Sequence, residues 1–516
     1  MLAQQRGLRG GLGRQRPLAT PLRGMRVTPP VHAGPLIAGL GVALVAYGTK
    51  LLMQATRNPK FQEAMCRTGA AEGKSGVVAM AAPERSQDAV ARSASFSFTT
   101  GTMGASLGGG SSSWSGACCA IWDRAGEGSV RVVENEQGGR TTPAVVAFGD
   151  SGKALVGLHA KRLLFSKSSV AVCGHQLLLG VAYDSAERRA FEKMGALGSL
   201  MLVPTPDGAA AVDVRSVRHT PAELLARTIA QLKADAEVAH GGRAVSSAVL
   251  SIPAGSDIAA RAAMEAAGRA AGLSHLELIE APVAAAIAAA VELAPVLDCA
   301  RRLAVFEWCG RAISVAVLVR RVGVDAPSPT RAEAWEIEAS SRRIIGGDGI
   351  GGFGSFGEPL ESVLVAHLAE KFRQEHGIEL RGDHLAMARL FEAAEAAKLE
   401  LSATYEAKIS LPYITANADG PKHLQTTLSR ARFEALAEPL LHEVLAVCED
   451  VEATLVGGDT LIACDALLLV GGHARLPALI KRLTCRFGGR VPLSCARPDE
   501  TLAFGAATHA QALQAL

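Results

Sequence analysis

Apolar and polar positions follow two patterns in the second half of the chain. Short apolar runs rich in β-branched residues, typical of buried strands, occur at residues 248–252, 303–306 and 315–319. Apolar residues recur at helical spacing over 257–271, 358–373 and 386–402. Strands that alternate with amphipathic helices indicate an α/β architecture.

The N-terminal region lacks this alternation. Residues 35–53 are almost wholly apolar apart from Lys50, and about 20 apolar residues are needed to cross a bilayer as a helix. The Lys50 amine lies near the end of this run, where it can reach the lipid headgroups. We expect a transmembrane anchor here. The three glycines at positions 39, 41 and 48 leave a buried segment or part of a targeting peptide as alternatives.

The segments on either side of this run differ in composition. Residues 1–33 contain six arginines and no acid, which is typical of a mitochondrial or plastid transit peptide; a disordered basic tail is the alternative. Residues 67–115 are rich in Gly, Ser, Ala and Thr, so we expect a largely disordered linker.

Composition and charge narrow the function classes. A chain of 516 residues with 49% hydrophobic and 20% charged residues is long enough for two or more globular domains. The net charge is +3, but nine Lys and Arg and no acid precede Glu63, so the basic excess gives no case for a nucleic-acid partner. The ten cysteines form no C-x-x-C pair, which argues against a disulfide scaffold and a zinc site.

Several ordered segments of the chain resemble the mitochondrial branch of the DnaK-type heat shock protein 70 chaperones, over roughly residues 112–511. The matching segments are 134–148, 156–162, 251–254, 270–273, 279–286, 420–424, 469–477, 498–500 and 505–507. The resemblance implies an α/β, actin-like ATPase fold with two lobes and ribonuclease H-like subdomains over residues 116–511. It implies ATP or ADP as ligand, and J-proteins and nucleotide-exchange factors as partners. Because the chain ends at Leu516, we expect no peptide-binding β-sandwich and no direct clamp on peptides.

On the base and ribose side of the nucleotide site, the resemblance carries over to individual residues. A glycine pair can approach an adenine face, and an arginine can stack on it. The residues that match the family motifs are Gly471, Gly472, Arg475, Asp499, Glu395, Lys398 and Ser402. A further glycine segment is assigned to Gly351 and Gly352, where Phe353 and Gly354 replace the acidic residues that the family has next.

On the phosphate side, the turn after strand 303–306 departs from the family. The family has Asp, three Gly and Thr there, and this chain has Glu307, Cys309, Gly310, Arg311 and Ala312. Of the three glycines only Gly310 remains, although several glycines are needed to wrap a phosphate with main-chain N–H groups. Arg311 either contacts phosphate or fills the site.

The remaining phosphate-side residues are also replaced. The second Asp of this motif is Ser314, and the first phosphate loop, assigned to residues 112–116, lacks its carboxylate. The family's Lys near the attacking water aligns with Gln176, or by a one-residue shift with His175. The Glu before Pro is Ala281, with Glu280 one residue earlier. We therefore expect no catalytic residue and no metal ligand for Mg²⁺.

These features predict a mitochondrial pseudo-ATPase, in the matrix or on the matrix-facing inner membrane. It would bind nucleotide weakly and offer its lobe surfaces to partners of the chaperone or import system. Three alternatives stay open. The first is an active ATPase that uses Glu280, Glu307 and Gln176, the second is a structural subunit of a mitochondrial membrane complex, and the third is a gene model that joins an anchor to a chaperone fragment.

Overall fold

The computed structural model describes residues 101–107, 116–122, 129–149, 153–165, 170–193, 200–323, 326–345 and 358–514. The predicted transit peptide at 1–33 and membrane anchor at 35–53 lie outside these ranges, as do Gly351 and Gly352. Among the helices in the described ranges, none is long and apolar enough to cross a membrane.

The first lobe is built on a sheet with the strand order β12-β11-β1-β2-β3, in which β4 also pairs with β2. Its strands are β1 (Gly101–Leu107), β2 (Gly116–Trp122), β3 (Val130–Val132), β4 (Thr142–Pro143), β11 (Val245–Ile252) and β12 (His275–Glu280). Helices α5 (Pro221–Ala239) and α6 (Ile258–Ala270) pack on this sheet. Asp257 caps α6 by accepting a hydrogen bond from the Ala260 amide.

Strand β1 shows that the linker expected over 67–115 is wrong for residues 101–107; its other residues lie outside the described ranges. This strand is parallel to β11 and antiparallel to β2, so neighbours satisfy its backbone on both sides. Its small residues give the composition of a linker, but the two ladders and the buried Met103 hold it in the sheet.

Two small antiparallel sheets complete the first lobe. One has the order β6-β5-β7 and the other β10-β9-β8. Their elements are β5 (Val145–Phe148), β6 (Ala154–Val156), α3 (Leu158–Arg162), β7 (Val170–Cys173), η2 (His175–Leu178), α4 (Ala186–Lys193), β8 (Met201–Pro204), β9 (Ala210–Val214) and β10 (Val217–His219).

The second lobe is built on a sheet with the order β15-β14-β13-β18-β19. Its strands are β13 (Arg302–Cys309), β14 (Ala312–Arg320), β15 (Trp335–Ile344), β18 (Ala466–Val470) and β19 (Leu493–Ser494). The strands and helices predicted from apolar spacing all lie within observed elements of the same type, allowing for their ends. The α/β prediction is confirmed.

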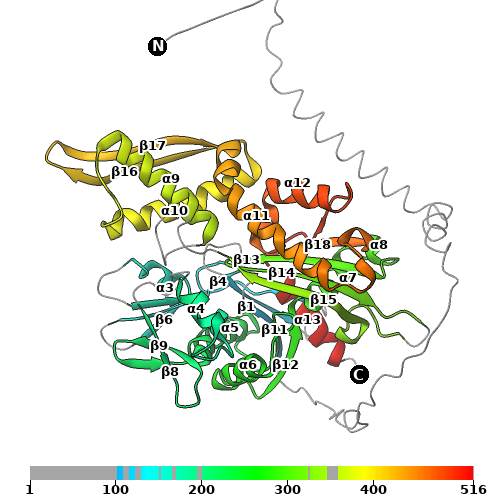
Figure 1. Cartoon of the computed structure of the whole chain (residues 1–516). Coiled ribbons are helices and arrows are strands. Elements are labelled where there is room, and N and C mark those ends of the chain that lie inside the picture. Colours follow the sequence, from blue (N-terminus) through cyan, green and yellow to red (C-terminus); the bar gives the residue numbers. More distant parts are fainter. Residues whose placement is uncertain are drawn as a thin grey trace, which may run out of the picture. The chain divides into compact units, whose positions relative to one another are not determined.

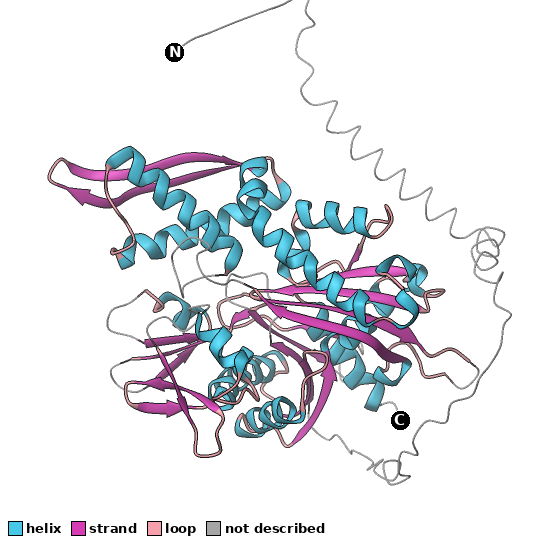
Figure 2. Cartoon of the chain, viewed as in Figure 1, coloured by secondary structure: helices cyan, strands magenta, loops and turns pink. Residues whose placement is uncertain are grey.

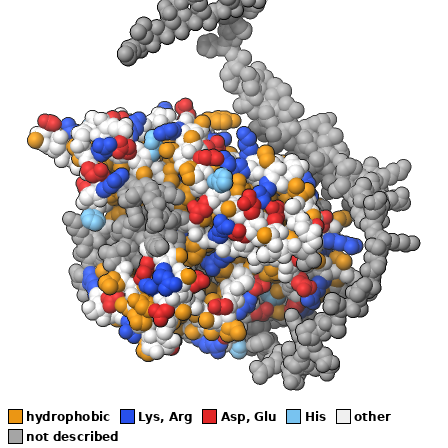
Figure 3. All heavy atoms as spheres, viewed as in Figure 1, with side chains coloured by type: hydrophobic (Ala, Val, Ile, Leu, Met, Phe, Trp, Pro, Cys, Tyr) orange, Lys and Arg blue, Asp and Glu red, His pale blue; other side chains and the backbone are white. Residues whose placement is uncertain are grey.

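Further helices and one long hairpin complete the second lobe, and the hairpin projects to one side of the sheet (Figures 1 and 2). They are α9 (Pro359–His376), α10 (His384–Ala403), β16 (Glu406–Asn417), β17 (Gly420–Ser429), α11 (Arg430–Thr454) and α12 (Pro477–Arg486). Asp383 caps α10 and Ser429 caps α11. The largest hydrophobic core lies between these elements and strands β13 and β14. On the face shown in Figure 3, positive and negative side chains are interspersed.

Helices α7 (Ala281–Glu292) and α13 (Thr501–Gln514) cross between the two sheets, and the short α8 (Ala294–Leu297) follows α7. Helix α7 packs on β13 and β18 of the second lobe, whereas α13 packs on α7 and on β1 and β2 of the first lobe. The two helices touch closely at Gly505, where a Cβ would lie 1.8 Å from the Ala284 carbonyl oxygen.

Candidate functional site

The turn between β13 and β14 is a two-residue hairpin. Cys309 pairs with Ala312, and Gly310 has φ +62° at the first central position, which glycine adopts at no steric cost. The Ile345 amide donates to the Arg311 carbonyl at 2.7 Å, and the Trp308 indole donates to the Gly310 carbonyl at 3.0 Å. The turn geometry alone therefore accounts for Gly310.

A row of polar side chains crosses three strands next to this turn. Glu307 is opposite Ser314, and Ser314 is opposite Arg342, so all three share one face of the sheet. The Ser314 hydroxyl donates to Glu307 Oε2 at 3.2 Å, and the Cys309 thiol donates to Glu307 Oε1 at 3.4 Å. Burial raises the pKa of Glu307, although these hydrogen bonds and the Arg342 charge oppose the shift. Both oxygens of the retained carboxylate are thus engaged by neighbours.

Two arginines line this region and remain within reach of solvent. Arg311 is half-buried and Arg342 is exposed. Burial lowers the pKa of Arg311, and the charges of Cys173 and Glu358 only partly offset this. Burial likewise lowers the pKa of Arg342, against the charge of Glu307. Because Cys173 belongs to the first lobe and Glu358 to the second, Arg311 lies where the two lobes meet.

The residues considered for catalysis are buried or occupied. His175 is fully buried, neither of its ring nitrogens has a hydrogen-bond partner, and burial lowers its pKa to about 4. Gln176 is half-buried beside it. Ala281 begins α7, and Glu280, which precedes it, pairs with Arg261 at 2.7 Å. Glu280 therefore has Arg261 as its ion-pair partner.

The segment assigned to the first phosphate loop, residues 112–116, lies mostly outside the described ranges. Leu107 pairs with Ala117, so β1 and β2 are antiparallel neighbours that residues 108–115 connect. Gly116 is the first residue of β2, and residues 112–115 lie outside the described ranges. No Asp or Glu occurs in residues 101–115, so the loop and the strand before it still lack the carboxylate.

The structure brings Gly471, Gly472, Arg475 and Asp499 together at the carboxyl end of β18. Gly471 has φ +93°, and a Cβ there would lie 2.3 Å from the Trp308 carbonyl oxygen. Its amide donates to the Pro498 carbonyl at 2.8 Å, which holds the segment before Asp499 in place. Gly472 begins the 3-10 helix η6 (Gly472–Arg475), and Arg475 forms an ion pair with Asp499. Arg475 is exposed and remains accessible to a ligand.

The three residues of α10 that were expected to contact adenosine interact with different parts of the protein. Glu395 pairs with Lys161 of α3 at 2.7 Å, which links the two lobes. The Ser402 hydroxyl donates to the Lys398 carbonyl of its own helix at 3.1 Å. Lys398 points into a buried polar cluster and is only 5% exposed. The three side chains therefore have different partners.

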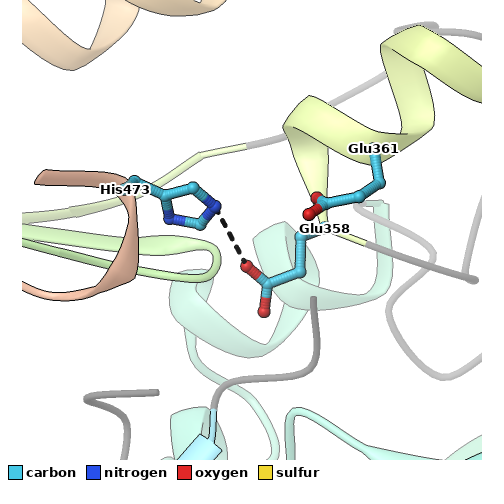
Figure 4. A group of neighbouring side chains, drawn as sticks. All are labelled: Glu358, Glu361 and His473. Atoms are coloured by element: carbon cyan, nitrogen blue, oxygen red, sulfur yellow. Dashed lines mark ion pairs between the residues drawn. The ribbon is translucent and has the colours of Figure 1, made fainter. Parts of the chain in front are cut away.

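This buried cluster contains three residues that the sequence did not single out: Glu358, Glu361 and His473 (Figure 4). Lys398 forms an ion pair with Glu361, and its Nζ lies 3.5 Å from His473 Nε2. His473 Nε2 lies 3.8 Å from Glu358 Oε2, and its ring lies 4.8 Å from that of Trp308. The sequence signal that could have pointed to this cluster is the pair of acids Glu358 and Glu361, which are three residues apart on either side of Pro359 at the start of α9.

Lys398 supplies the positive charge in this cluster. Burial lowers the pKa of Lys398, but Glu361 and then Glu358 and Glu395 outweigh it, so the pKa is raised. Burial and the Lys398 charge hold the pKa of His473 well below its usual range, so its imidazole is neutral. The ligand atoms of Glu358, Glu361 and His473 lie within 4.8 Å of one another and could hold a metal ion, but the Lys398 ammonium already supplies a cation there.

The family model for the Hsp70 protein matches residues 113–515, which is more than half of the chain. The match confirms the actin-like fold with two lobes and supports a chaperone-type function. Domains of this family generally bind ATP or ADP and work with J-proteins and nucleotide-exchange factors. The crossing helices and all strands of the two sheets except β1 lie within this match, so the chain belongs to the Hsp70 family.

Proposed function

We propose that this chain is a pseudo-ATPase of the Hsp70 chaperone system, which binds nucleotide weakly, without help from Mg²⁺, and does not hydrolyse ATP. The observation that carries this proposal is the state of Glu307. Its two oxygens accept hydrogen bonds from Ser314 and Cys309, and burial raises its pKa. A carboxylate in this state is a poor ligand for hydrated Mg²⁺.

The other requirements of phosphoryl transfer support the same proposal. The reaction needs carboxylates that hold Mg²⁺, a cation on the phosphates and a group that orients the attacking water. Ser314 and Ala281 offer no carboxylate, and Glu280 is paired with Arg261. His175, beside the position of the family's Lys, is buried and uncharged at neutral pH because its pKa is about 4.

The base side of the site supports residual nucleotide recognition. Gly471, Gly472, Arg475 and Asp499 converge at the end of β18, and Arg475 remains exposed. An arginine that is held by a carboxylate can still stack on an aromatic ring. We therefore assign weak adenosine binding to this side.

The proposed location is mitochondrial, in the matrix or on the matrix-facing inner membrane. The arginine-rich residues 1–33 and the apolar residues 35–53 motivate it. Candidate partners are J-proteins and nucleotide-exchange factors that bind the lobe surfaces. Fractionation of cells that express the chain with a C-terminal tag tests the location, and recovery outside mitochondria would contradict it.

The function is tested by calorimetric titration of the full chain with ATP, with and without Mg²⁺, together with a single-turnover hydrolysis assay. We expect Mg²⁺ to give no gain in ATP affinity and the hydrolysis to stay at the level of a no-protein control. Mg²⁺-dependent tight binding with turnover would favour the active ATPase, and no nucleotide binding would favour the structural subunit.

A further inference from the structure

The second lobe carries a groove outside the candidate site. Helix α9, the end of β17 and the start of α11 form its walls, and its volume of about 670 Å³ is in the range of pockets that bind small molecules. None of its lining residues is among those assigned to the nucleotide or to Mg²⁺. We call it the α9 groove; basic and hydroxyl side chains line it, among them His367, Lys371, Thr427, Ser429 and Arg432.

Three basic groups meet in the α9 groove. His367 and Lys371 are four residues apart on α9 and therefore share one face of the helix, and Arg432 reaches the groove from the first turn of α11. Burial lowers the pKa of His367, and the charges of Arg432 and Lys371 lower it further. Both cations therefore act on the same imidazole, which places the three groups around one point of the groove.

These groups keep hydrogen-bond donors that no neighbour uses. Within the part of the chain that the structure describes, the guanidinium of Arg432 takes part in no ion pair or hydrogen bond, and the same holds for the imidazole of His367. Lys371 Nζ donates to Thr426 Oγ1 at 2.6 Å, and an ammonium group has three donors. An anion between α9 and α11 can therefore bond to all three side chains without breaking a hydrogen bond of the groove.

The acids of the α9 groove are compensated to different degrees. The Glu370 carboxylate accepts hydrogen bonds from Arg373 at 2.7 and 2.8 Å, which lower its pKa to about 2. Glu375 Oε1 lies 3.7 Å from Lys371 Nζ, beyond hydrogen-bond distance. Glu406 forms no ion pair within the described ranges, so it is the acid that opposes an anion in the groove.

We propose that the α9 groove binds a small organic phosphate, whose phosphate group is held by Arg432, Lys371 and His367. A guanidinium binds phosphate oxygens through paired, charge-assisted hydrogen bonds, and an ammonium adds a compact charge. A phosphate monoester carries about 1.5 to 2 negative charges at pH 7, which matches the two cations. The groove leaves room beyond the phosphate group, where the hydroxyls of Thr427 and Ser429 offer hydrogen bonds to the organic part.

The test is calorimetric titration of the full chain with glycerol 3-phosphate, with glycerol and with inorganic phosphate. We expect glycerol 3-phosphate to bind and glycerol not to bind. Arg432→Gln should weaken the binding of glycerol 3-phosphate by about tenfold to a hundredfold, the range of one hydrogen bond to a charged group. Glu406→Gln should strengthen it, because the variant removes a repelling charge from the groove.

The matched control lies on the first lobe. Arg218 of β10 is exposed and forms no ion pair with another described residue, so Arg218→Gln removes the same charge from the chain but outside the α9 groove. It should leave the affinity for glycerol 3-phosphate as in the parent chain. Arg432→Lys keeps the charge without the paired donors and should retain part of the affinity.

The proposal is overturned if neither phosphate binds at millimolar concentration, if Arg432→Gln binds glycerol 3-phosphate as the parent chain does, or if Arg218→Gln shows the same loss. Tighter binding of inorganic phosphate than of glycerol 3-phosphate would contradict the organic part of the ligand. The affinity for ADP should not change in Arg432→Gln, so this proposal and the proposed function can fail independently of each other.

Discussion

Burial decides the charge of several single residues in this chain. Burial lowers the pKa of His175 to about 4 and raises that of Glu307, so both shifts favour the neutral form. Their effects on folding have opposite signs. The free energy of unfolding is not reduced by His175 above the ordinary pKa of 6.5, and it falls as the pH falls from 6.5 toward 4, because the unfolded state then binds a proton that the folded state does not. Glu307 contributes to the free energy of unfolding at low pH, where its carboxyl group is protonated, and this contribution is lost as the pH rises through its raised pKa.

The pH dependence of His175 gives a prediction at this scale. Between pH 7 and pH 4, the buried imidazole should reduce the free energy of unfolding by about 3 kcal/mol, at 1.36 kcal/mol per pKa unit. His175→Leu should remove this part of the acid sensitivity, as measured by urea denaturation at both pH values. The exposed His384 gives the control, because His384→Leu should leave the acid sensitivity unchanged. Equal acid sensitivity in His175→Leu and the parent chain would contradict the prediction.

Site residues could be predicted from the sequence where a motif fixes them locally. Gly471, Gly472, Arg475 and Asp499 were selected by segment order, and the structure brings them together. Glu358, Glu361 and His473 were missed, because their contact joins α9 to the turn after β18 and depends on tertiary packing. The partners of Glu395 and Glu280 were missed for the same reason.

At the scale of elements, the apolar strands and amphipathic helices of the core follow their sequence pattern. Strand β13 and helix α10 were predicted because buried runs and helical spacing are local signals. Strand β1 was not predicted, since Gly, Ala, Ser and Thr supply five of its seven residues and only its two neighbouring strands make it a strand.

The contact between α7 and α13 gives a prediction about elements. A Cβ at Gly505 would lie 1.8 Å from the Ala284 oxygen, so Gly505→Ala must separate two helices that are buried between the sheets. We expect a loss of about 3 kcal/mol in the free energy of unfolding, the upper end for overpacking a core. Gly149→Ala is the control, because a Cβ there meets nothing within 4 Å. Similar denaturation midpoints for the two variants would show that the helices can move apart without cost.

For the molecule as a whole, α13 is bound to both lobes at both of its ends. Asp499 and Glu500, at its start, pair with Arg475 of the second lobe and Arg140 of the first. Near its end, His509 Nδ1 accepts the Ala332 amide of the second lobe, which leaves the Nε2 hydrogen for Glu277 of the first at 2.9 Å. The helix thus fixes how the lobes meet around the candidate site.

The central place of β1 predicts where the chain can be shortened. A protein of residues 82–516 keeps the strand and should fold, whereas one of residues 112–516 lacks it and leaves β11 and β2 without their shared partner. We expect the longer protein to show a cooperative thermal transition and a single compact species by gel filtration. The shorter protein should lack both, and a normal transition in it would contradict the central role of β1.

The position of β1 also determines how the folded domain responds to a pulling force. The residues before Gly101 are attached to a strand in the middle of a sheet, with hydrogen-bonded neighbours on both sides. A force applied through the N-terminal segment, by a protease or a translocation motor, therefore shears two ladders at once instead of peeling off an edge strand one bond at a time. Under a force applied at its N-terminal end, the domain should therefore stay folded until the whole sheet unfolds in one cooperative step.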